Sequence, residues 1–90
     1  MQACFHCEVS GKVQGVWFRA STRERALALH LQGFARNLAD GGVEVVATGA
    51  DDELDALEQW LWQGPPLAKV TKVEREALAS EVAFEGFVTL

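Results

Sequence analysis

The residues best suited to chemistry stand in one short segment that contains two glycines and ends in an arginine. It reads Gly11-Lys12-Val13-Gln14-Gly15-Val16-Trp17-Phe18-Arg19. The glycines allow a tight turn that brings several main-chain N–H groups to one point, and amides at a helix start attract anions. The Arg19 guanidinium can meet two phosphate oxygens at once. The segment therefore predicts a phosphoryl cradle, although such glycines also occur in ordinary turns and Arg19 alone also fits a surface charge.

The elements that must position this segment follow from the periodicity on either side of it. Before it, apolar residues alternate with polar ones, as in a half-buried strand: Phe5, Cys7 and Val9. After it, Ala20 to His30 is rich in helix formers. This helix has two apolar rows, and we favour the row with small residues for the side that faces the sheet: Thr22, Ala26 and Leu29. A strand, a loop and a helix are therefore expected in this order.

A hairpin and a second helix are predicted next. Gln32 to Leu38 is an extended candidate, Asp40-Gly41-Gly42 is a turn signal, and Val43 to Thr48 is a β-branched run. Asp51-Asp52-Glu53 then offers a capping residue and first-turn acids. Leucines recur at helical spacing before Gly64-Pro65-Pro66 ends the helix: Leu54, Leu57 and Leu61.

Two strands complete the predicted order. Leu67 to Ala77 is strand-like, and its alternation is broken near Thr71-Lys72, which indicates a bulge or an edge position. A turn is predicted at Ala79-Ser80-Glu81. The last strand is predicted from apolar residues of one parity: Val82, Phe84, Val88 and Leu90.

The order β-α-β-β-α-β with a short terminal strand predicts an α+β, ferredoxin-like two-layer sandwich, with a mostly antiparallel sheet and two helices on one face. The first strand and the strand that holds Asn37 are expected to run parallel, so that their C-terminal ends lie at one edge. Asn37 would then approach the loop that ends at Arg19. Taken alone, Asn37 also fits a turn residue that bonds its own backbone.

The bulk composition indicates a single globular domain, residues 1–90, with 49% hydrophobic and 23% charged residues. The net charge of -5 argues against a nucleic-acid partner. No membrane partner is expected, because no run of apolar residues is long enough to span a bilayer, and the first residues carry no basic segment before an apolar run. The expected location is cytoplasmic.

The two cysteines form a C-x-x-C pair, Cys4 and Cys7, which metal and redox sites also use. Residues three apart in a strand face opposite sides, so the two sulfurs should diverge. No second pair supplies the ligands of a structural zinc site. We therefore expect no metal site and no cofactor, with Cys7 buried and Cys4 at a strand end.

The segment from Gly11 to Arg19 resembles the signature loop of acylphosphatases, G-x-V-Q-G-V-x-F-R, with Trp17 in the variable position. The similarity continues in G-F-A-R-N-L-A-D-G from Gly33 to Gly41 and in G-P-P-L-A-K-V from Gly64 to Val70. This resemblance implies that Arg19 binds phosphate and that Asn37 positions the attacking water. One departure is His30, where the family often has glycine at the end of the first helix.

The implied activity is hydrolysis of acyl phosphates to a carboxylate and inorganic phosphate. The carboxylate leaves without a proton donor, because its pKa is about 4. Catalysis then requires a held phosphoryl group and an aimed water. The expected phosphate ligands are the main-chain amides in the loop together with the Arg19 side chain: Gln14, Gly15, Val16, Trp17, Phe18 and Arg19. Inorganic phosphate should act as product and inhibitor, and the protein should be a monomer.

Three other readings share parts of this pattern. A metal-chaperone domain has the same order of elements but needs its C-x-x-C in the loop, and an RNA-recognition domain needs aromatic residues on its central strands and a basic face. A non-catalytic domain that binds phosphate or carbamoyl phosphate would use the same loop. This last reading is the alternative to an enzyme, and turnover of an acyl phosphate separates the two. The sequence also leaves open whether the Trp17 indole packs beside the site or points outward.

Overall fold

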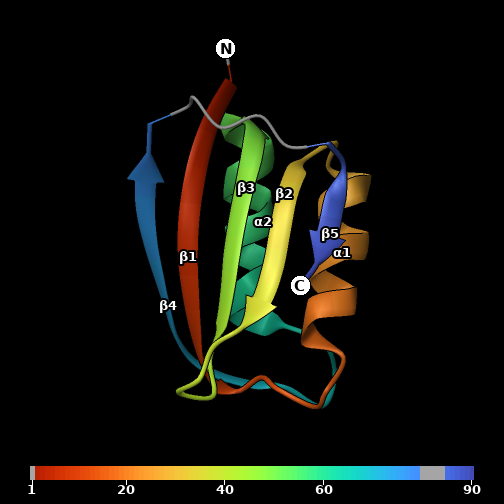
Figure 1. Ribbon diagram of the computed structural model, residues 1–90, viewed down its shortest axis with the longest axis vertical. Coiled ribbons are helices and arrows are strands. Elements are labelled where there is room, and N and C mark those ends of the chain that lie inside the picture. The colour runs from red at the N-terminus through yellow and green to blue at the C-terminus, as the bar shows by residue number, and fades with distance from the viewer. Residues whose placement is uncertain (1, 80–84) are drawn as a thin grey trace.

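The computed structural model describes residues 2–79 and 85–90 and has the expected order of elements (Figure 1). The helices are α1 (Phe18–Ala28) and α2 (Asp51–Gln63). The strands are β1 (Gln2–Lys12), β2 (Gln32–Asn37), β3 (Val43–Ala50), β4 (Lys69–Leu78) and β5 (Phe87–Thr89). The predicted helix over 20–30 therefore begins and ends two residues earlier, and β3 extends two residues beyond the predicted run.

The five strands form one sheet in the order β4-β1-β3-β2-β5. Among the described strands, the pairs β1–β3, β1–β4 and β2–β3 are antiparallel, and the β2–β5 pair is parallel. Because β1 and β2 both run antiparallel to β3, they run parallel to each other and end at the same edge. In Figure 1 this is the lower edge, where the loop after β1, the start of α1 and the β2–β3 hairpin meet. The predicted ferredoxin-like sandwich is confirmed.

The core lies between the sheet and the two helices. Phe5, Cys7 and Val9 face it, as their alternation predicted. Thr22 and Ala26 of α1 are fully buried, and Leu29 packs against the core, so the small-residue row faces the sheet. The predicted leucines of α2 are also fully buried: Leu54, Leu57 and Leu61. Burial of such side chains gives about 1.5 to 3 kcal/mol each.

The irregularity in β4 is a bulge, and β4 is an edge strand, as the sequence indicated. Ser10 pairs with Lys72 but Gly11 pairs with Val70, so Thr71 is the extra residue. Gly11 adopts φ 121°, and a Cβ there would lie 2.1 Å from the main-chain oxygen of Lys69. The bulge therefore requires glycine where β1 enters the loop.

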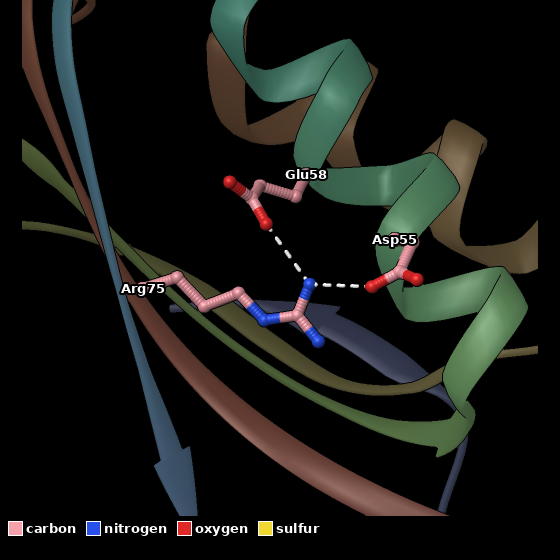
Figure 2. Close-up of polar contacts among 3 residues, drawn as sticks. All are labelled: Asp55, Glu58 and Arg75. Atoms are coloured by element: carbon pink, nitrogen blue, oxygen red, sulfur yellow. Dashed lines mark hydrogen bonds and ion pairs between the residues drawn. The ribbon is translucent and has the colours of Figure 1, made fainter.

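A polar contact ties β4 to α2 (Figure 2). Nη1 of Arg75 donates to Asp55 Oδ1 at 2.7 Å and to Glu58 Oε1 at 2.9 Å. The guanidinium carbon also lies 5.0 Å from the centre of the Phe5 ring. Burial lowers the pKa of Arg75, but its hydrogen bonds and ion pairs with Glu58 and Asp55 outweigh this, so the pKa is raised. Arg75 thus links the edge strand β4 to α2 and lies against the buried Phe5 ring.

Three details of the sequence prediction were wrong. The N-cap of α2 is Ala50, with no side-chain hydrogen bond, so none of the acids caps the helix. Cys4 is buried within β1 rather than at its end. In β5 the buried residue is Phe87, while Val88 and Leu90 are exposed, so the predicted parity is inverted. Positions 80 and 81 of the predicted turn, with Val82 and Phe84, lie outside the described residues.

Candidate functional site

A pocket of about 340 Å³ lies at the edge where β1 and β2 end. Its lining includes five of the residues predicted for the site: Gly15, Trp17, Phe18, Arg19 and Asn37. Val13, Ala20 and Thr89 complete the lining. Arg19 and Asn37 are 18 positions apart in the sequence, and the β-α-β arrangement brings them to one cavity.

The loop before α1 has the backbone form of an anion-binding nest. The φ angles of Gly15 and Trp17 are 73° and 66°, whereas Val16 between them and Phe18 after them have negative φ. Such alternation turns successive N–H groups toward one side of the chain. In the described part of the chain, none of the amides from Gly15 to Arg19 donates to another main-chain oxygen. These amides, at the start of α1, are therefore available to an anionic ligand.

Arg19 lines the pocket and is held by the residue that follows β5. Its Nη1 donates to the main-chain oxygen of Leu90 at 2.7 Å, and Arg23, one turn later, donates from Nε to the main-chain oxygen of Phe87 at 2.9 Å. The remaining guanidinium donors of Arg19 make no hydrogen bond to the described residues. Sequence reasoning missed this contribution of β5, because nothing in the local pattern indicates parallel pairing with β2.

Asn37 is the last residue of β2 and is partly buried. Side chains alternate between the two faces of a strand, so Asn37 lies on the same face as Gly33 and Ala35. These two residues are buried, and this face is therefore the one that the helices cover. The hydrogen bonds of the described residues include none from its side-chain amide. The turn is closed instead by Asp40, whose Oδ1 accepts from the Gly42 amide at 2.9 Å. The structure therefore does not support the alternative in which Asn37 bonds its own backbone.

Gln14 joins the loop to the hairpin that carries Asn37. Its side-chain Nε2 donates to the main-chain oxygens of Leu38 at 2.7 Å and of Gly42 at 2.9 Å. The side chain of Gln14 therefore points away from any phosphate ligand, and that of Val16 is buried in the core. Neither residue lines the pocket, so only their main-chain amides can serve the predicted role. The tether itself gave no signal in the sequence beyond the family motif.

The ionisable groups near the core do not form a reactive centre. Burial, followed by the negative charge of Glu58, raises the pKa of the Cys7 thiol from 9.0 to about 12, against the opposing effect of Arg75. Cys7 is therefore protonated at neutral pH. Cys4 and Cys7 are both free and buried, and no group of three or more His, Cys, Asp or Glu residues suited to a metal ion occurs in the described ranges. No helix among them is long and apolar enough to cross a membrane.

Comparisons with known proteins identify a family over most of the chain. The family model "Acylphosphatase" matches residues 5–89. An acylphosphatase of Xanthomonas euvesicatoria pv. vesicatoria is 65% identical over 81 residues, which cover 90% of this chain and 91% of the relative. The structure of an acylphosphatase from Coxiella burnetii has a TM-score of 0.94 at 45% identity, covering 99% of this chain and 93% of that one. The crystal structure of the acylphosphatase from Bacillus subtilis has a TM-score of 0.94 at 30% identity, covering 100% of this chain and 99% of that one.

Proposed function

The chain belongs to the acylphosphatase family and is a hydrolase of acyl phosphates, and on that premise we propose how its pocket performs the reaction. The main-chain amides of residues 14–19 and the Arg19 side chain bind the phosphoryl group. Asn37 holds the attacking water. The observation that carries the proposal is the shared pocket of Arg19, Asn37 and the Gly15 nest.

In the proposed reaction, the water oxygen forms a bond to phosphorus while the bond from phosphorus to the carboxyl oxygen breaks. The bonding electrons leave with the carboxylate, which needs no proton because its pKa is about 4. The proton of the water passes to a phosphate oxygen. The amides and Arg19 stabilise the charge on the equatorial oxygens, and the Asn37 amide can both accept from and donate to the water.

The first test is hydrolysis of benzoyl phosphate, followed by loss of ultraviolet absorbance. We expect turnover that persists in the presence of a chelator and competitive inhibition by inorganic phosphate. Arg19→Gln should abolish most of the activity, whereas Arg25→Gln, an exposed position on the same helix, should retain it. Phosphate binding without turnover would show a binding domain instead of an enzyme.

We further propose that residues 1–90 act as one domain and as a monomer in the cytoplasm. The continuous core between one sheet and two helices supports a single folding unit. One cooperative unfolding transition and a monomeric mass in sedimentation equilibrium are the expected results.

A further inference from the structure

Trp17 stands out among the pocket residues because the fold does not account for it. Its side chain is 78% exposed, so it adds little to the core. Its backbone is left-handed, with φ 66° and ψ 22°, a conformation that costs stability in any residue with a side chain and that glycine adopts freely. Unlike His30, which has a similar φ outside the pocket, Trp17 lines the pocket, and this combination of exposure, strain and position points to a role in the site.

The pocket has a polar part and an apolar part. Arg19, Asn37 and the Gly15 backbone offer groups that suit the phosphoryl group and the water. Trp17, Phe18 and Val13 supply apolar surface, but Phe18 and Val13 are almost completely buried, whereas the indole is exposed. The phosphoryl group does not use this surface, so it is available to the rest of the substrate.

The line of attack at phosphorus also separates the polar part of the pocket from the part that receives the acyl group. In-line attack places the leaving carboxylate on the side of phosphorus opposite to the water that Asn37 holds. The acyl group then leaves on the side away from Asn37, and Trp17 is among the other residues that line the pocket. Because the amide of Trp17 belongs to the nest and its backbone lies at the N-cap of α1, the indole is attached next to the proposed phosphoryl site.

We propose that the Trp17 indole binds the acyl group and makes the enzyme selective for acyl phosphates with aromatic or extended apolar acyl groups over short aliphatic ones. This inference rests on the proposed function. An aromatic ring stacks on an indole face, whereas an acetyl group offers only one methyl. Trp17 is thus a specificity-determining residue rather than a catalytic one.

The test compares kcat and KM for benzoyl phosphate and acetyl phosphate in wild type, Trp17→Ala, Trp17→Phe and Trp17→Gly. Trp17→Ala should lower kcat/KM for benzoyl phosphate about three- to tenfold more than it lowers kcat/KM for acetyl phosphate, mainly through KM. Trp17→Phe should retain most of the selectivity. Trp17→Gly relieves the backbone strain and should lose selectivity as Trp17→Ala does, which separates the indole from the loop conformation.

Trp62→Ala is the matched control, since Trp62 is a half-exposed tryptophan of α2 outside the pocket. Its selectivity should equal that of wild type. Equal losses for both substrates in Trp17→Ala, or no loss for either, would overturn the role of the indole while leaving the hydrolase activity in place. A wild-type protein that hydrolyses neither substrate would instead overturn the proposed function.

Discussion

The side chain of Gln14 donates a hydrogen bond from Nε2 to the main-chain oxygen of Leu38, 2.7 Å away. Leu38 directly follows Asn37, and a second bond from the same nitrogen reaches Gly42 at 2.9 Å. The loop proposed to hold the phosphoryl group and the strand end that carries Asn37 are therefore joined by one side chain. Loss of this link should therefore change the distance between Asn37 and the loop before α1.

Gln14→Ala should lower both stability and turnover. Two hydrogen bonds contribute about 1 to 3 kcal/mol to the free energy of unfolding, and a small shift of Asn37 relative to phosphorus should reduce kcat about tenfold or more. Chemical unfolding and steady-state kinetics measure the two effects, with exposed Gln59→Ala as the control. A variant with wild-type kcat would show that the link has no positioning role.

The buried thiol of Cys7 should make stability fall at high pH. Its pKa is about 12 in the folded protein and 9.0 when exposed. Above pH 9 the unfolded state releases the proton and the folded state retains it, so the free energy of unfolding decreases as pH rises. Between pH 8 and pH 10 the wild type should lose about 1 kcal/mol more than Cys7→Ala does.

Urea unfolding at a series of pH values measures this difference. Cys4→Ala is the matched control, because it removes a buried cysteine and keeps Cys7 in place. Its stability should fall with pH as that of the wild type does. Identical pH dependence in wild type and Cys7→Ala would show that the Cys7 thiol does not cause the loss of stability at high pH.

His30 should be a point where stability can be gained. It has φ 60°, directly after α1, where a residue with a side chain is strained. His30→Gly should therefore raise the free energy of unfolding by about 1 kcal/mol, without any effect on hydrolysis, because His30 does not line the pocket. His30→Ala keeps the strain and should show no such gain. If alanine and glycine stabilise equally, the left-handed backbone is not the cause.

Much of this fold could be predicted from periodicity. The alternation in β1, the small-residue row of α1 and the leucine spacing of α2 each gave the correct buried face, because burial of one face is what these patterns record. The bulge in β4 could be predicted because the alternation of apolar and polar residues is broken there. The topology then required β1 and β2 to end at one edge, which correctly brought Asn37 to the pocket of Arg19.

The rest depended on contacts between distant segments. The parity of β5 was wrong because a three-residue strand carries too short a pattern, and its parallel pairing with β2 decides that Phe87 is the buried residue. The Gln14 tether and the hydrogen bond from Arg19 to Leu90 are likewise long-range. The exposure of Trp17 also had to come from the structure, since a tryptophan at a helix start can pack either way.

The central claim is a division of roles: Arg19 and the nest hold the phosphoryl group, and Asn37 aims the water. The most direct test measures both kcat for benzoyl phosphate and the affinity for inorganic phosphate in Asn37→Ala and Arg19→Gln, with Gln32→Ala at the other end of β2 as the control. Asn37→Ala should lose about a hundredfold or more in kcat while its phosphate affinity stays near that of the wild type, and Arg19→Gln should lose both. Wild-type kcat in Asn37→Ala, or a loss of phosphate affinity there as large as in Arg19→Gln, would contradict the account.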